Sequence, residues 1–312
     1  MGAVSAAGLA VPGWASAMSP LNVVATTGMV ADAARQVGGA LVTVDALMGP
    51  GIDPHSYRQT RSDLVALTQA DLVLWHGLYL EAQLEELMER LAGSQQVVAV
   101  GEAVPETLLR SHEDYEGRFD PHVWMDPSLW AYVVQAVQSA LTEARPEAAE
   151  EFARNADAYL ESVNALDIYT REVLSSVPQD ARLLLTAHDA FGYFGTAHGF
   201  EVMGIQGIST ESEAGLQRIG ELVDVLVSRD VRAVFVETSV SDRNIRALIE
   251  GAAARGHDVV IGGALYSDAM GEPGTYEGTY LGMIDHNATV IAGALGGTVP
   301  NRGRLGQLAV GG

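Results

Sequence analysis

Residues 146–177 limit the possible folds of this chain more than any other segment, because they contain no glycine and no proline after Pro146. Their apolar residues recur at helical spacing, and a proline is well tolerated at the start of a helix. At 1.5 Å per residue, about 30 residues give a helix of roughly 45 Å, which is longer than a small domain is wide. We therefore predict one long, rigid helix that joins two folded lobes.

Short apolar segments alternate with helical segments on both sides of this helix. Such alternation is typical of parallel sheets that helices cover on both faces. The sequence thus predicts an α/β fold with two lobes, each with mostly parallel strands flanked by helices. The expected bounds are 21–145 for the N-terminal lobe, 146–177 for the connecting helix and 178–312 for the C-terminal lobe. The expected strands lie at 22–28, 41–48, 71–75, 96–100, 182–186, 201–205, 231–236 and 258–261.

The first 20 residues are mostly small and apolar and include Ala15-Ser16-Ala17. This pattern is typical of the apolar core and cleavage site of a secretory signal, although the usual basic start is absent. We expect residues 1–20 to be a signal remnant or a disordered N-terminus. The mature protein is then expected to be exported, soluble and periplasmic. No run of 18 apolar residues is present, so no membrane-spanning helix is predicted.

The charge of the chain is strongly negative, with 40 acidic against 18 basic residues and a net charge of −22. A nucleic-acid-binding protein needs a basic face, so we expect no nucleic-acid partner. The chain has no cysteine. Disulfides, thiolate metal ligands and a lipid-anchored N-terminal cysteine are therefore not expected. Any metal site has to use His, Asp and Glu.

The tripeptide Asp-Pro-His occurs twice, at 53–55 and at 120–122, in a chain with only eight histidines. Proline restricts the residue before it and stiffens each loop, so that less entropy is lost when a ligand binds. A third histidine and an aspartate each follow a predicted strand in the second half. Ligands of open α/β sheets bind at the carboxyl ends of strands, so we expect four side chains to meet in one cleft. These candidate metal ligands are His55, His122, His188 and Asp268.

Three imidazoles and one carboxylate are a ligand set that suits Zn²⁺. Asp189, beside His188, is a candidate for orienting one of the rings, and His76 is a candidate to line the cleft. We expect His198, His257 and His286 to be structural or exposed. An acidic stretch before the second motif is either a solvated connector or an accessory metal-capture loop. Its candidate residues are His112, Glu113, Asp114 and Glu116.

Five segments give the chain a close resemblance to the TroA-like family, the zinc or manganese substrate-binding proteins of ABC importers (cluster A-I). The resemblance covers nearly the whole mature chain, and the order and spacing of the segments make it specific. The segments are Asp53-Pro54-His55, Asp120-Pro121-His122-Val123-Trp124-Met125-Asp126-Pro127, Thr186-Ala187-His188-Asp189-Ala190-Phe191-Gly192-Tyr193, Ile208-Ser209-Thr210-Glu211-Ser212-Glu213 and Leu265-Tyr266-Ser267-Asp268.

The resemblance implies two α/β lobes joined by a long helix, with the metal bound between them. It also implies that His55, His122, His188 and Asp268 are the metal ligands, and that an ABC permease in the membrane is the partner. Members that favour manganese commonly have glutamate where this chain has His188. Many zinc members have a long histidine-rich loop before the second histidine, whereas residues 111–119 contain a single histidine.

We therefore predict a monomeric periplasmic receptor that binds Zn²⁺ and delivers it to an ABC permease. A periplasmic metallochaperone is a candidate metal donor. A manganese receptor of the same family is the first alternative. A zinc hydrolase is a second alternative, but catalytic zinc usually has three protein ligands and an open position, and no HExxH motif is present. A receptor for haem or an iron chelate is a third. The short His and Asp pattern favours a bare ion, so we predict that the protein is not an enzyme.

Overall fold

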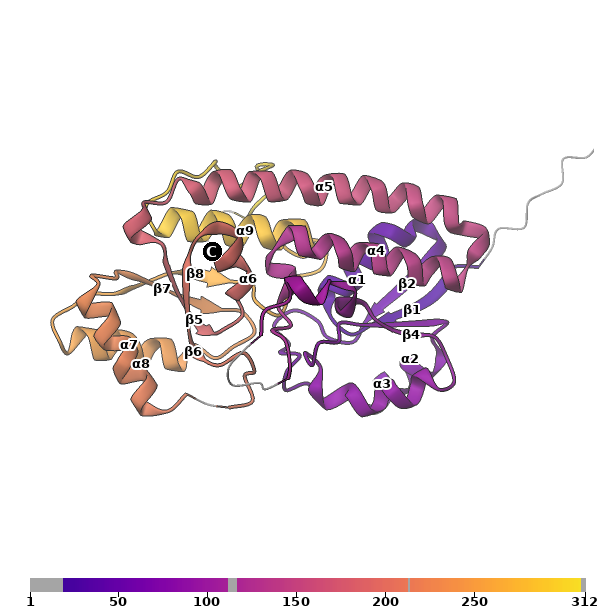
Figure 1. Cartoon of the computed structure of the whole chain (residues 1–312), viewed down its shortest axis with the longest axis horizontal. Coiled ribbons are helices and arrows are strands. Elements are labelled where there is room, and N and C mark those ends of the chain that lie inside the picture. Colours follow the sequence, from indigo (N-terminus) through magenta and orange to yellow (C-terminus); the bar gives the residue numbers. More distant parts are fainter. Residues whose placement is uncertain (1–18, 112–116, 213, 310–312) are drawn as a thin grey trace, which may run out of the picture.

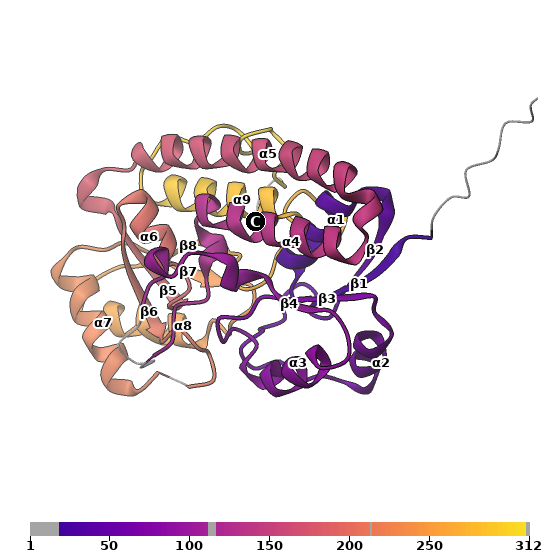
Figure 2. The ribbon, with the colours of Figure 1, turned by 45° about the vertical axis from the view of Figure 1, so that its right-hand side comes forward.

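Two halves of the chain lie side by side beneath one long helix (Figure 1). The computed structural model describes residues 19–111, 117–212 and 214–309. The long helix is α5 (Ala149–Ser175), and a 3-10 turn at Pro146–Ala148 precedes it. At 1.5 Å per residue, α5 is about 40 Å long, and it extends over both halves in Figures 1 and 2. The predicted long helix is confirmed.

A parallel sheet of four strands forms the centre of the first half. The elements of this half are β1 (Leu21–Ala25), α1 (Gly28–Gly38), β2 (Val42–Ala46), α2 (Arg61–Gln69), β3 (Leu72–Trp75), α3 (Glu85–Ala92), β4 (Val97–Ala99) and α4 (Pro127–Ala144). The strand order is β2-β1-β3-β4. Val23 packs with α1 and α4 and Val24 with α2 and α3, because successive residues of a strand point to opposite faces. Parallel strands with helices on both faces are confirmed here.

Polar side chains fix where two helices of this half begin. Thr60 and Asp63 form a capping box at the start of α2, in which each side chain accepts a backbone N–H of the other residue. Asp126 caps α4 by accepting a hydrogen bond from the backbone N of Ser128 at 2.9 Å, and Pro127 occupies the first helical position. The loops that precede these helices, which contain the two Asp-Pro-His motifs, therefore have fixed ends.

The second half again alternates strands and helices, but its strands pair two by two. The elements are β5 (Leu183–His188), α6 (Gly192–His198), β6 (Glu201–Gln206), α7 (Leu216–Ser228), β7 (Ala233–Glu237), α8 (Arg243–Ala253), β8 (Val260–Leu265) and α9 (Tyr280–Ala294). β5 pairs with β6 and β7 pairs with β8, both in parallel. β5 and β7 lie next to each other without a continuous ladder. The predicted parallel arrangement is confirmed.

The largest apolar core runs through both halves. α5 packs against α1 and α4 in the first half and against α9 in the second, as Figures 1 and 2 show. Phe152 and Leu166 of α5, Val30 of α1 and Ile284 of α9 belong to this single buried cluster. Separating the halves would expose part of this cluster to water, which is unfavourable. The shared core therefore opposes large relative movement.

We propose to divide the chain at the ends of the long helix, into an N-terminal lobe (21–145) and a C-terminal lobe (178–312). The observation behind this division is that every strand pairing among the described residues stays within one of these two ranges. The predicted signal remnant falls almost entirely on residues 1–18, outside the described part of the chain. Among the described residues, no helix is both long and apolar enough to cross a membrane.

Candidate metal centre

The two Asp-Pro-His motifs hold the backbone of their histidines in the same way. The first follows β2 and the second precedes α4, so both lie in loops of the N-terminal lobe. Oδ1 of Asp53 accepts a hydrogen bond from the backbone N of His55 at 2.9 Å, and Oδ1 of Asp120 accepts one from the backbone N of His122 at 3.0 Å. Such bonds are typical of Asx turns. Together with the intervening proline, each turn restricts where the histidine can point.

The C-terminal lobe supplies the other two candidate ligands from the ends of two strands. His188 is the last residue of β5 and pairs with Gln206 of β6, whereas we had expected it just past the strand. Asp268 lies in the loop that follows β8. Both side chains are fully buried. The carboxyl ends of these strands therefore face the Asp-Pro-His loops of the other lobe, as predicted from the general placement of ligands in α/β sheets.

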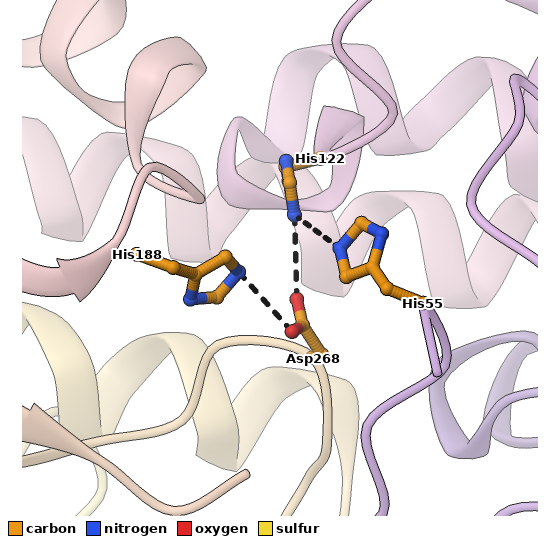
Figure 3. A group of neighbouring side chains, drawn as sticks. All are labelled: His55, His122, His188 and Asp268. Carbon is orange, nitrogen blue, oxygen red and sulfur yellow. Dashed lines mark hydrogen bonds and ion pairs between the residues drawn. The ribbon is translucent and has the colours of Figure 1, made fainter. Parts of the chain in front are cut away.

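The four side chains point toward one another (Figure 3). Nε2 of His122 lies 3.3 Å from Nε2 of His55 and 3.4 Å from Oδ1 of Asp268. Nε2 of His188 lies 3.2 Å from Oδ2 of Asp268. One potential ligand atom from each residue falls within 4.8 Å of all the others. The four residues thus surround one small volume from four separate segments of the chain.

The spacing of these atoms fits a small divalent cation. Four ligand atoms placed about 2.0–2.1 Å from a zinc ion in a tetrahedron are about 3.3 Å from one another. The three separations given above are 3.2, 3.3 and 3.4 Å. In addition, Nε2 of His188 and both carboxylate oxygens of Asp268 are buried and, among the described residues, have no hydrogen-bond partner apart from the ion-pair contacts within the cluster itself. Buried polar atoms without partners are costly, and a cation at the centre would satisfy all of them.

Two of the three rings each have a further carboxylate at Nδ1. Nδ1 of His122 is 2.8 Å from Oδ1 of Asp120, and Nδ1 of His188 is 2.5 Å from Oε2 of Glu237, the last residue of β7. The other oxygen of Glu237 accepts a hydrogen bond from the backbone N of His188 at 2.9 Å. With Nδ1 held by a carboxylate, Nε2 of each ring is left to bind a metal. Such partners orient the ring and raise its basicity.

Sequence reasoning did not find Glu237. The sequence offered Asp189, the neighbour of His188, as a candidate for orienting a ring, but the carboxylate at Nδ1 of His188 is that of Glu237. These two residues are 49 positions apart, and they meet because β5 lies beside β7. The available signal was the position of Glu237 itself, a carboxylate at the carboxyl end of an apolar strand.

The protonation of the metal-free site differs from ring to ring. Burial lowers the pKa of His55 to about 3. Burial acts in the same direction on His122, but the carboxylates of Asp120 and Asp268 outweigh it and raise the pKa of His122 to about 9. Burial is likewise outweighed at His188, whose pKa Glu237 and Asp268 raise well above the usual value. At neutral pH and without metal, the rings of His122 and His188 are therefore positively charged, and each has to lose one proton when a cation binds.

The remaining sequence candidates among the described residues do not belong to the four-residue cluster. His76 is fully buried, its Nε2 donates to the carbonyl of Pro121 at 2.7 Å, and it does not belong to the four-residue cluster. Nε2 of His257 and of His286 contact backbone carbonyls at 2.7 and 2.9 Å, and His198 is buried. The predicted accessory residues, His112, Glu113, Asp114 and Glu116, lie outside the described part of the chain.

Two α/β lobes with a buried His and Asp cluster between them define the class of metal-binding receptors that serve transporters. Residues 23–294 match the family model described as ZnuA, the periplasmic component A of the zinc-uptake complex. The chain belongs to this family. Members of the family are receptors that work with the permease of an ABC transporter, not enzymes. The predicted family is thus confirmed, and its finer placement in cluster A-I stays a prediction.

Three named relatives differ in the metal that their names give. The manganese-binding lipoprotein MntA of Bacillus subtilis is 47% identical over 281 residues, which cover 90% of this chain and 91% of MntA. The zinc-binding protein TroA of Treponema pallidum is 47% identical over 273 residues, 88% of each chain. The iron-binding protein YfeA of Yersinia pestis is 31% identical over 294 residues, 94% of this chain and 92% of YfeA.

The solved structure of TroA from Treponema pallidum superimposes with a TM-score of 0.87 at 46% sequence identity. The match covers 89% of this chain and 99% of the TroA chain. The fold of the family is therefore present over nearly all of the chain. The relatives establish that the chain binds a metal ion, and they leave the choice between zinc and manganese to the ligand chemistry. Because MntA is named a lipoprotein, the expectation that this chain has no lipid anchor stays a prediction.

Proposed function

We propose that this protein is a periplasmic receptor that binds one Zn²⁺ between its two lobes and delivers it to an ABC permease. The ligands are Nε2 atoms of His55, His122 and His188 and the carboxylate of Asp268. The observation that carries the proposal is the convergence of these four buried side chains from four segments, with three separations close to the edge of a zinc tetrahedron.

Ligand chemistry favours zinc over manganese at this site. Imidazole nitrogen suits zinc, whereas carboxylate, carbonyl and water suit manganese, and zinc binds more strongly in the general order of divalent metals. Nitrogen atoms make up three of the four ligands here. Manganese is the alternative, supported by the similarity to MntA. A hydrolase is disfavoured, because four protein ligands occupy all positions of a tetrahedron and leave none open for water.

Competition between the two metals tests the choice of zinc. We expect zinc to displace manganese from the protein at equal concentrations, measured by equilibrium titration with a chelator of known affinity. Displacement of zinc by manganese under these conditions would establish the alternative. The variant His188→Glu exchanges one nitrogen ligand for a carboxylate, so it should narrow the difference between the two metals. Anomalous scattering above and below the zinc edge, on protein purified without added metal, identifies the ion bound in the cell.

We further propose that the protein works in the periplasm as a monomer. Its partners would be the permease of the transporter and, in addition, a periplasmic metallochaperone as metal donor. The net charge of −22 supports a role in attracting cations rather than nucleic acid. Sedimentation with and without zinc checks the oligomeric state, and a stable dimer would contradict it.

The acidic segment before the second Asp-Pro-His motif is proposed as an accessory loop that speeds metal capture. Residues 112–116 contain one histidine and three carboxylates, and such charge changes association rates more readily than affinity. Deletion of 112–116 should slow zinc uptake from a chelator, measured by stopped flow, and leave the equilibrium constant within about threefold. Unchanged rates would show that this segment is only a solvated connector.

A further inference from the structure

Trp124 lies between the ligand-bearing loops of the two lobes. It is fully buried in the 3-10 turn Val123–Met125, two residues after the proposed ligand His122. Its indole Nε1 donates a hydrogen bond of 2.8 Å to the backbone carbonyl of Ser267. Ser267 immediately precedes the proposed ligand Asp268. One hydrogen bond therefore connects the segment that carries a ligand of the N-terminal lobe to the segment that carries a ligand of the C-terminal lobe.

Tyr280, the first residue of α9, also contacts Trp124. Its hydroxyl donates a hydrogen bond of 2.9 Å to the carbonyl of Trp124. Its backbone N donates a bond of 3.0 Å to Oδ2 of Asp32 on α1, and its ring stacks on Trp130 of α4 at a centroid distance of 5.0 Å. Tyr280 is fully buried. A residue of the C-terminal lobe is thus fixed to two helices of the N-terminal lobe and bonds directly to the backbone of Trp124.

These bonds form a series that crosses between the lobes three times, from Asp32 to Tyr280, from Tyr280 to Trp124 and from Trp124 to Ser267. Trp124 also contacts the ligand ring of His122 edge-on, with centroids 5.2 Å apart. Buried hydrogen bonds are strengthened by their apolar surroundings, and breaking one leaves a buried polar group without a partner. The series therefore opposes any change in the distance between the two ligand loops.

We propose that Trp124 and Tyr280 are positioning residues that hold the two halves of the metal site at binding distance before metal arrives. The distance they maintain is that between Nε2 of His122 and Oδ1 of Asp268, 3.4 Å, which Figure 3 shows across the centre of the site. This inference rests on the proposed ligand set. Without the series, the loops would be free to separate, and part of the binding free energy would be spent on bringing them together.

The test compares variants that each remove one donor and keep an aromatic side chain; Tyr280→Phe keeps its ring, whereas Trp124→Phe also makes the side chain smaller. Tyr280→Phe removes the hydroxyl that bonds to Trp124, and Trp124→Phe removes the indole N–H. Tyr169→Phe is the matched control, because the hydroxyl of Tyr169 on α5 bonds to Thr289 of α9 at 3.3 Å, away from both ligand loops. Zinc affinity is measured by chelator competition well below the melting temperature, and the visible absorption of bound Co²⁺ reports the geometry of the ligands.

We expect Tyr280→Phe and Trp124→Phe each to weaken zinc binding about five- to tenfold, to speed dissociation and to change the Co²⁺ spectrum, because the loss of a buried partner is costly. Tyr169→Phe should bind zinc as wild type does. The double variant should bind more tightly than the product of the single effects predicts, since both bonds act in one series. Should Trp124→Phe fail to fold, Tyr280→Phe decides alone.

Wild-type zinc affinity and an unchanged Co²⁺ spectrum in Tyr280→Phe would overturn the proposal, even if that variant melts at a lower temperature. Such a result would assign the series a purely structural role. Failure of the proposed function is recognised separately, because His122→Ala would then bind zinc as tightly as wild type. An equal loss of affinity in Tyr169→Phe would also count against the proposal, since it would show that any weakened contact of α9 has the same effect.

Discussion

The two Asp-Pro-His motifs have the same sequence but place their histidines in different surroundings. Oδ1 of Asp120 lies against both the backbone N and the ring Nδ1 of His122. Asp53 bonds to the backbone of His55 in the same way, but its other oxygen accepts a hydrogen bond of 2.5 Å from the hydroxyl of Thr210 in the C-terminal lobe. One aspartate thus orients a ligand ring, whereas the other connects the two lobes.

The difference between the motifs appears in the charge of the rings. The pKa of His122 is raised to about 9 and that of His55 is lowered to about 3, so of these two rings only that of His122 is positively charged at neutral pH without metal. The tripeptide fixes the backbone of the histidine, and the surrounding carboxylates set its protonation. Each motif therefore supplies one nitrogen ligand, but only the ring of His122 has to lose a proton before metal binds.

Removal of either histidine ring should have the largest effect on zinc affinity. The two removals should differ in how they change the stability of the metal-free protein. We expect His122→Ala and His55→Ala each to weaken zinc binding by at least about 100-fold, because each deletes one of four ligands. In the metal-free protein, His122→Ala should also lower the free energy of unfolding by about 2 kcal/mol, since a charged hydrogen bond to Asp120 is lost. His55→Ala lacks that second effect. Chelator competition and chemical denaturation measure the two quantities.

Retention of wild-type zinc affinity in either alanine variant would remove that residue from the ligand set. Equal stability losses in the two metal-free variants would show that the carboxylate of Asp120 makes no special contribution to the fold. The variant His257→Ala serves as a control, because His257 is buried against the carbonyl of Val231 and does not belong to the cluster.

Acid should release the metal, and the protons involved come from His122 and His188 rather than from His55. Both raised pKa values mean that these rings are protonated in the metal-free protein at pH 7. Zinc then displaces about two protons, and its affinity should fall by about 100-fold for each pH unit in the range below the pKa of His122. The stability of the metal-free protein changes with pH in the opposite direction. A raised histidine pKa stabilises the fold at low pH, and this contribution is lost as the pH rises toward 9.

Titration calorimetry of zinc binding in buffers of different ionisation enthalpy counts the released protons. The increase in melting temperature caused by zinc should therefore grow between pH 6 and pH 8. A count near zero at pH 7 would mean that neither ring is charged without metal, and the contrast between the two motifs would then be wrong. Nitrogen-detected NMR of the rings assigns the protons, with a neutral His55 expected throughout this range.

Local sequence was sufficient to predict much of this fold and site. The absence of glycine and proline after Pro146 predicted the long helix α5. The apolar segments before His188 and Asp268 predicted that both follow strands; this holds for Asp268, whereas His188 is the last residue of β5. Each of these predictions depended only on residues that are close together in the sequence. The orienting role of Asp120 was missed, although Asp120 lies only two positions from the ring that it orients.

Contacts between distant segments could not be predicted in this way. Glu237 meets His188 across 49 positions, and Trp124 meets Ser267 across 143. Neither pair has a spacing that a helix or a strand would impose, so only the assembled lobes bring them together. The pairing of the second-half strands in two separate sheets was also missed, because apolar strand patterns indicate burial and not the neighbour with which a strand pairs.

The carboxylate of Asp120 should contribute more to zinc affinity than that of Asp53. In Asp120→Asn the amide oxygen can still accept the hydrogen bond from the backbone N of His122, but the negative charge at Nδ1 is lost. Outer carboxylates of this kind are typically worth about 10- to 100-fold in metal affinity, and we expect a loss in that range together with a lower pKa for His122. Asp126→Asn is the matched control in the same loop, because Asp126 caps α4 and does not belong to the ligand cluster.

The smallest effect is expected from the same substitution in the first motif. In Asp53→Asn the amide oxygen keeps the bond to the backbone of His55, and no charge is removed from a ligand ring. The contact with Thr210 becomes a neutral hydrogen bond, which is roughly half as strong as a charged one, so the lobes should separate more readily at this edge. We therefore expect zinc affinity within about threefold of wild type and a slightly faster release, measured by transfer to an excess of chelator. A loss as large as that of Asp120→Asn would mean that the tripeptide itself, and not the carboxylate at the ring, determines how strongly each motif binds metal.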